Sequence, residues 1–256
     1  MAVGFESVGI GAYAAGNFDT SLTAGFDHQS SGGCAVVGMS FAAGNFQFLW
    51  YIDPNELADL TRTVTYGGVP MTSTGVVAWG GDEHAWIEQF VLFNAPPGKQ
   101  RIEGKVWGGV SSFRNLRLSA ATYTGVDSVG DPIEQSGSGP AMTISGTAAT
   151  NDRFVGVFGT QSGISAFNGD QRYLDNSGIS LLIGDSLGTG SSQDVTATRQ
   201  KSGKWSGLLL PLNAADTVAS SAPLSFAPRF DPVRLHREQR TGGLQRNVFT
   251  VEAPEV

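Results

Sequence analysis

Short apolar stretches recur along the chain at near-regular spacing, and Gly, Ser, Asn and Asp separate them. Several alternate polar with apolar residues: Leu116, Leu118 and Ala120 fall on one face of such a stretch, and Arg117 and Ser119 on the other. A period of two with β-branched and aromatic residues is typical of half-buried strands. The expected strands are 34–41, 46–52, 61–66, 85–93, 101–107, 116–123, 141–145, 153–158, 178–183, 194–199 and 205–210.

Glycine pairs at 32–33, 67–68, 80–81 and 108–109 mark turns or bulges between these stretches. One short helix is expected at 53–60, where Asp53 offers an N-cap and Pro54 the first helical position. Strands do not alternate with long helical segments, which argues against a βαβ enzyme core. The pattern therefore predicts an all-β fold, a jelly-roll-like antiparallel β-sandwich.

The composition changes near Asn213, which places the sandwich domain at 1–213 and a linker and extended C-terminal arm at 214–256. The sandwich carries 11 basic and 18 acidic residues, and therefore the whole net charge of −7, whereas the arm has five of each and is neutral. The arm is too poor in apolar residues to fold alone. Its five arginines are the candidate partner-binding residues, on the acidic surface of a neighbouring copy: Arg229, Arg234, Arg237, Arg240 and Arg246.

The charge and the apolar runs exclude two classes of partner. A net charge of −7 argues against binding nucleic acid through its phosphates. No apolar run reaches the roughly 18 residues of a membrane span, and the N-terminus lacks the basic and apolar regions of a signal peptide. We expect a protein made in the cytoplasm without a signal peptide and without membrane insertion. The single cysteine, Cys34, lies in an apolar stretch and is expected to be a buried, unreactive thiol.

Two short motifs suggest chemistry that their surroundings do not support. Gly184-Asp185-Ser186-Leu187 spells the signature of the GDSL hydrolases, but the Asp-x-x-His pair of that family is missing, since Val233 stands three residues before His236. Asp82-Glu83-His84 has metal-ligand residue types, yet only Asp82 and His84 would share a face of a strand, and two ligands fall short of the three or four of a zinc site. We therefore predict no catalytic residue, no metal site and no cofactor.

Aromatic residues provide one further candidate site. Most of them lie inside strand patterns, where core packing is the expected role. Trp79 is followed by Gly80-Gly81 and is the best candidate for an exposed ring that stacks on a sugar. Trp79 is therefore the candidate glycan-binding residue.

A series of strand-and-turn motifs resembles a known family. Thr63-Val64-Thr65-Tyr66-Gly67-Gly68-Val69-Pro70-Met71-Thr72 is followed by Glu88-Gln89-Phe90-Val91-Leu92-Phe93-Asn94-Ala95-Pro96-Pro97-Gly98-Lys99-Gln100, by Ala121-Thr122-Tyr123-Thr124-Gly125-Val126 and by Trp205-Ser206-Gly207-Leu208. This order resembles a β-sandwich domain of minor tail and other virion proteins of tailed phages of actinobacteria. The resemblance covers about residues 1–213.

The resemblance implies a non-enzymatic structural virion protein. A minor tail protein is expected, which assembles with other virion proteins and with copies of itself and is located in the phage particle. Alternatives are a capsid decoration protein and a carbohydrate-binding module that contacts a glycan of the host envelope. An esterase of the GDSL type is the enzyme alternative.

Overall fold

The computed structural model describes residues 1–43, 60–79, 85–108 and 113–215. The regular elements within these ranges are strands, and their pairings are antiparallel. In chain order the strands are β1 (Gly4–Val8), β2 (Ala12–Asp19), β3 (Ser21–Ser30), β4 (Cys34–Ala43), β5 (Thr61–Tyr66), β6 (Val69–Pro70), β7 (Thr72–Ala78), β8 (Ala85–Leu92), β9 (Gly98–Trp107), β10 (Phe113–Thr124), β11 (Val126–Val129), β12 (Ile133–Thr147), β13 (Arg153–Thr160), β14 (Ile164–Phe167), β15 (Asp170–Asp175), β16 (Ser180–Leu187) and β17 (Ser192–Ala214).

The strands form three sheets. Sheet A has the order β1-β10-β4-β8-β7, with β2 also paired to β10. Sheet B has the order β3-β9-β5-β6. Sheet C has the order β11-β17-β13-β16-β15, with β12 and β14 also paired to β17. The predicted all-β sandwich class is confirmed, and the structure has a third sheet.

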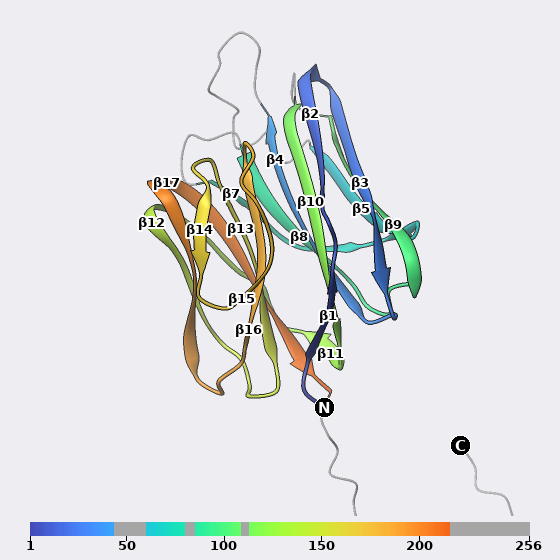
Figure 1. The fold of residues 1–256 in the computed structure, drawn as a ribbon, viewed down its shortest axis with the longest axis vertical. Coiled ribbons are helices and arrows are strands. Elements are labelled where there is room, and N and C mark those ends of the chain that lie inside the picture. The colour runs from blue at the N-terminus through green and yellow to red at the C-terminus, as the bar shows by residue number, and fades with distance from the viewer. Residues whose placement is uncertain (44–59, 80–84, 109–112, 216–256) are drawn as a thin grey trace, which may run out of the picture. The chain divides into compact units, whose positions relative to one another are not determined.

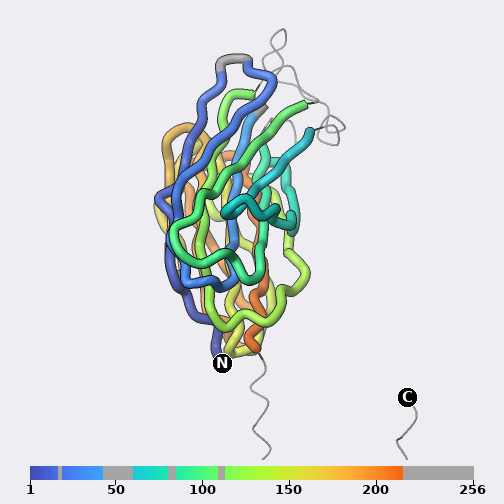
Figure 2. The backbone as a smooth tube through the Cα atoms, turned by 90° about the vertical axis from the view of Figure 1, so that its right-hand side faces the viewer, coloured from blue at the N-terminus to red at the C-terminus, as the bar shows by residue number. Residues whose placement is uncertain are grey.

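Sheet A lies between the other two sheets (Figure 1). Figure 2, which faces the side of sheet B, shows blue β3 and green β9 nearest the viewer. One core fills the space between sheets A and B and includes Phe41, Leu118 and Ile102. A second core fills the space between sheets A and C and includes Tyr123 and Leu210. Because both faces of sheet A are covered, its middle strands are buried along their length. Such burial is usual for parallel sheets and less common for an antiparallel sheet such as this one.

This burial corrects one expectation. The alternation in 116–123 predicted a strand with one polar, solvent-facing side, but Arg117 is only 1% exposed and Ser119 is fully buried. Sheet C covers that face, and the Arg117 guanidinium forms an ion pair with Asp175 on β15. The polar residues of β10 therefore mark the contact with sheet C.

Sheet C folds back on itself to enclose a third core. The hairpin of β12 and β17 bends where Gly139 pairs with Gly203, and these glycines have φ values of 123° and 159°. The bend lays the first half of β17 over β13 and β16, with Val195, Phe158 and Leu182 packed between them. Residues 194–199 and 205–210 were expected to be separate strands and are parts of this one long strand.

Several predicted features fall at the limits of the described residues. The strand 46–52 and most of the helix 53–60 lie outside them. The predicted domain boundary follows Asn213, whereas β17 runs to Ala214, the amide of Ala215 donates to Gly125 O, and the first compact unit extends from Met1 to Thr217. The predicted arm lies outside the described residues from 216 onward. The described part contains no helix of the length and apolarity that a membrane span needs.

Candidate functional site

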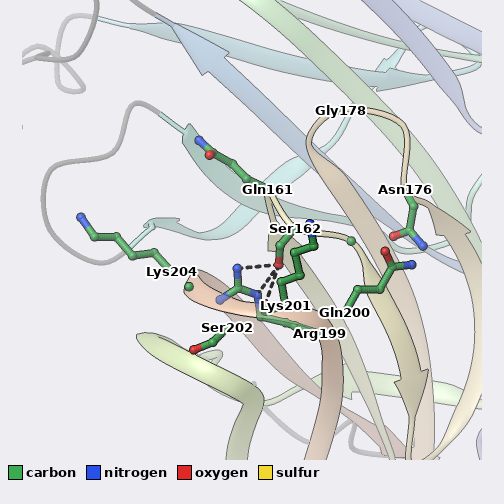
Figure 3. A pocket seen from close by; sticks show the side chains of 11 residues that line it. Gln161, Ser162, Asn176, Gly178, Arg199, Gln200, Lys201, Ser202 and Lys204 are labelled. Carbon is green, nitrogen blue, oxygen red and sulfur yellow. Dashed lines mark hydrogen bonds between the residues drawn. The ribbon is translucent and has the colours of Figure 1, made fainter.

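A polar cavity of about 630 Å³ opens at the bend of sheet C (Figure 3). Three of the described segments, distant from one another in sequence, line it: the turn between β13 and β14, the turn after β15, and the bent part of β17. We call it the Arg199 pocket. Its lining residues are Gln161, Ser162, Gly163, Asn176, Gly178, Arg199, Gln200, Lys201, Ser202, Gly203 and Lys204.

The guanidinium of Arg199 is the fixed element of this pocket. Arg199 is only 5% exposed. Its Nε and Nη2 donate to Ser162 Oγ at 3.0 and 2.6 Å, and its Nη1 donates to Gly139 O at 3.1 Å. Ser162 Oγ in turn donates to Lys201 O at 2.9 Å. Figure 3 shows Arg199 and Ser162 joined in the middle of the lining residues. These bonds hold the guanidinium in one orientation.

The loops around Arg199 are tied to the neighbouring strand. The side-chain amide of Asn176 both accepts from Ile164 N and donates to Ile164 O, each at 2.8 Å. The backbone N–H of Gln200 donates to Gly163 O at 3.0 Å. The turn after β15 and the turn before β14 are therefore fixed to each other and to β17, which preforms the walls of the pocket.

The lining is cationic in a chain with an excess of acids. Arg199, Lys201 and Lys204 line the pocket, and none of the described lining residues is an acid. Clustered cations with amide and hydroxyl neighbours can hold an anionic oxygen group by charge-assisted hydrogen bonds.

A second cavity provides a contrast. It has a volume of about 270 Å³ and is lined by residues within 31–34, 93–94 and 123–126. None of its described lining residues has a basic or acidic side chain. Cys34 lies in its wall, and burial raises the pKa of this thiol to about 12, which agrees with the predicted buried and unreactive cysteine.

The predicted glycan-binding residue is not on the surface. Trp79 is fully buried and packs with Ala85 and Ile179, so the prediction of an exposed, sugar-stacking ring is wrong. The two glycines after Trp79 indicated an exposed loop. The ring is instead buried between sheet A and sheet C, which the local sequence does not reveal. The candidate partner-binding residues lie outside the described residues: Arg229, Arg234, Arg237, Arg240 and Arg246.

The segment with the GDSL signature, 184–187, lies within β16 and thus extends the predicted strand 178–183. Asp185 is fully buried and forms ion pairs with Arg153 and Arg172. Ser186 Oγ accepts a hydrogen bond from Gln193 Nε2 at 3.1 Å. The contacts of these two side chains are therefore those of a structural strand. Two of the three histidines, His84 and His236, lie outside the described residues.

A buried histidine lies between sheets A and B. His28 Nε2 is 3.0 Å from Ser7 Oγ, and its Nδ1 is 3.1 Å from the hydroxyl of Tyr66. Ser7 Oγ is also 2.6 Å from Thr122 Oγ1. Burial lowers the pKa of His28 below its usual value, and the charge of Glu6 offsets part of this shift. A phenol stands where a hydrolytic triad would place a carboxylate, and the network joins four strands across the core.

The residues of the Arg199 pocket were not predicted from the sequence. The sequence feature that could have indicated this pocket is the run 199–204, which holds three basic residues and no acid in a charge-poor chain. Among the described residues, no group of three or more His, Cys, Asp or Glu is placed to hold a metal ion, and Asp82-Glu83-His84 lies outside them.

The fold and the pocket define an all-β protein of three stacked antiparallel sheets with a cationic, polar pocket. Comparison of the chain with known protein families, curated proteins and solved structures found no match in any of the three.

Proposed function

We propose that this protein is a non-enzymatic structural component of a tailed phage particle, and specifically a minor tail protein that assembles through subunit contacts. The observation that carries the proposal is the resemblance of its strand-and-turn motifs to virion β-sandwich domains. In the structure these motifs lie in strands of all three sheets and in the turns between them. Thr63–Tyr66 belongs to β5, Gly67-Gly68 forms the turn to β6, and Glu88–Leu92 belongs to β8.

The side chains of these motifs serve packing, which suits a building block. Tyr66 and Phe90 are buried in the core between sheets A and B. Glu88 is 2% exposed, and its carboxylate accepts hydrogen bonds from Arg62 Nε at 2.7 Å and from Ser73 Oγ at 2.6 Å. Two cores between three sheets favour a rigid subunit, and rigid subunits lose little conformational freedom when they assemble.

The distribution of charge supports assembly through the arm. Residues 1–213 carry the net charge of −7. The segment 229–246 contains five arginines and only two acidic residues in its sequence. Arginine forks bind carboxylates in a bidentate manner, and an extended segment gains affinity by wrapping a neighbour. The arm of one copy is therefore proposed to dock on the acidic surface of the next.

Immunogold electron microscopy of phage particles, with an antibody against residues 1–217, tests the proposal. Label at the tail or its tip would support a minor tail protein. Label over the head would replace it by the alternative, a capsid decoration protein. Particles without label, with the protein free in the lysate, would exclude a virion role.

A truncation tests the arm separately. The chain is to be cut after Thr217 and not after Asn213, because Ala214 N donates to Asp152 Oδ1 and Ala215 N to Gly125 O. We expect the truncated protein to melt as the full chain does and to enter particles poorly. Glutamine at all five arm arginines provides the matched full-length variant. Normal incorporation of both variants would show that the arm has no assembly role.

A further inference from the structure

We propose that the Arg199 pocket binds an anionic glycan, with a carboxylate or phosphate group held by its basic side chains and sugar hydroxyls held by its amide and hydroxyl side chains. This binding does not depend on a virion role, since the described lining residues all belong to sheet C and its adjoining turns. A failure of one proposal therefore leaves the other standing.

The size of the pocket suits a small organic ligand. Its volume of about 630 Å³ lies within the range of roughly 300–1,000 Å³ that is usual for small-molecule sites. An inorganic ion would fill only a small part of it. The pocket therefore has room for a sugar unit that carries a charged group and for a second sugar unit linked to it.

The position of Arg199 suits an anionic group. A buried guanidinium exerts a stronger attraction on an anion than one in bulk water, because the surroundings screen its charge less. Each nitrogen of Arg199 is anchored by Ser162 Oγ or Gly139 O. This anchoring reduces the entropy that binding would otherwise cost. Lys201 and Lys204 add two positive charges to the same lining.

The other lining residues favour a hydrophilic ligand. None of the described lining residues has an aromatic or aliphatic side chain. Protein and peptide partners depend on apolar and aromatic anchors for much of their affinity. Neutral sugars bind largely by stacking on aromatic rings, which this lining does not provide. Gln161, Gln200 and Ser202 instead offer donors and acceptors that match sugar hydroxyls.

Calorimetric titration of the full chain tests this assignment. The probes are trigalacturonate, which carries carboxylates, and poly(glycerol phosphate), which carries phosphates. Galactotriose is the neutral comparison and tetraglutamate the acidic peptide. We expect one or both of the anionic probes to bind, galactotriose not to bind, and the affinity to fall as salt is added. The two anionic probes distinguish a carboxylate from a phosphate ligand.

Paired lysine variants locate the binding. The double variant Lys201→Gln/Lys204→Gln is expected to lose about tenfold or more in affinity for the anionic probe. Lys99→Gln/Lys105→Gln removes the same charge from sheet B, where Lys99 contacts Asp27 and Lys105 lies over Trp107, and is expected to bind as the wild type. Both variants change surface side chains, and equal melting temperatures would show that the fold is intact.

Three results would overturn the assignment. The first is that neither anionic probe binds at low salt. The second is that both lysine variants bind as the wild type does, which would place binding elsewhere. The third is that tetraglutamate binds more tightly than both trigalacturonate and poly(glycerol phosphate), which would identify the pocket as a site for acidic peptide.

Discussion

The hydroxyl of Tyr123 on β10 donates a 3.1 Å hydrogen bond to the carboxylate of Asp185 on β16, and both residues are fully buried. This contact joins sheet A to sheet C inside their shared core. Burial, with the charge of Asp185 added, raises the pKa of Tyr123 well above its usual value, so the phenol remains a donor. Arg153 and Arg172 also bind Asp185, which neutralises the buried carboxylate.

Replacement of Asp185 by Asn should strongly destabilise the protein. The substitution keeps the size of the side chain but leaves two guanidinium groups beside a neutral amide. Removal of one partner from a buried ion pair costs about 3–5 kcal/mol. Urea unfolding of Asp185→Asn should show a loss of free energy of unfolding in that range.

Asp170→Asn is the control for this prediction. Asp170 contacts the same two arginines, but its side chain is 64% exposed. An exposed ion pair contributes about 0–1 kcal/mol. Equal losses from the two substitutions would show that burial of Asp185 does not determine its contribution.

His28 should make the stability depend on pH. Burial lowers its pKa in the folded protein below the value of 6.5, which it keeps in the unfolded chain. The unfolded chain therefore binds a proton first as the pH falls, and the contribution of neutral His28 is complete above pH 6.5 and is lost below it. The free energy of unfolding should fall between pH 7.5 and 5.

His28→Gln should make this fall shallower, because the titrating group is removed. Glu6 does not titrate in the same pH range. Burial alone would raise its pKa, but hydrogen bonds from Ser31, Thr122 and Ser30 outweigh this effect, so that the pKa of Glu6 is lowered. Its contribution is lost only below pH 4.5. The same slope in both proteins would show that His28 does not cause the pH dependence.

Trp79 should contribute to stability and not to glycan binding. Its side chain is fully buried, and truncation of a buried tryptophan costs about 3–5 kcal/mol. Trp79→Ala should lose that amount in urea unfolding. Its indole Nε1 has no hydrogen-bond partner within the described residues, so Trp79→Phe should cost clearly less. A stable Trp79→Ala variant that loses affinity for glycans would contradict this prediction.

Gly68 should be required by the conformation of the β5–β6 hairpin. Gly67 and Gly68 have φ values of 58° and 81°, as the two-residue turns of hairpins demand. A Cβ at Gly68 would meet nothing within 4 Å, so any cost comes from the backbone alone. Gly68→Ala should lower the free energy of unfolding by about 1–2 kcal/mol. Gly68→Asn should cost less, because asparagine tolerates this region; equal costs would refute the backbone explanation.

Strand prediction from alternation succeeded where the side chains of a strand differ clearly between its faces. The strand 61–66 was predicted with its observed bounds, because Val64 and Tyr66 are buried and alternate with the exposed Thr63 and the half-buried Thr65. β3 was missed although it alternates, with Leu22, Phe26 and His28 on its buried face. A polar histidine on the inner face obscures the hydrophobic pattern, and its ring nitrogens find partners in Ser7 and Tyr66, which are distant in sequence.

The sequence by itself determined the fold class, the turn at Gly67-Gly68 and the burial of Cys34. These features depend on local residue types, turn conformations and apolar runs. The tertiary structure alone decided that Trp79 and Arg117 are buried, that 192–214 is one bent strand, and that Arg199 lies in a pocket. Each of these depends on a second sheet or on a turn distant in sequence. Alternation indicates that a strand has two faces, but it cannot indicate what covers each of them.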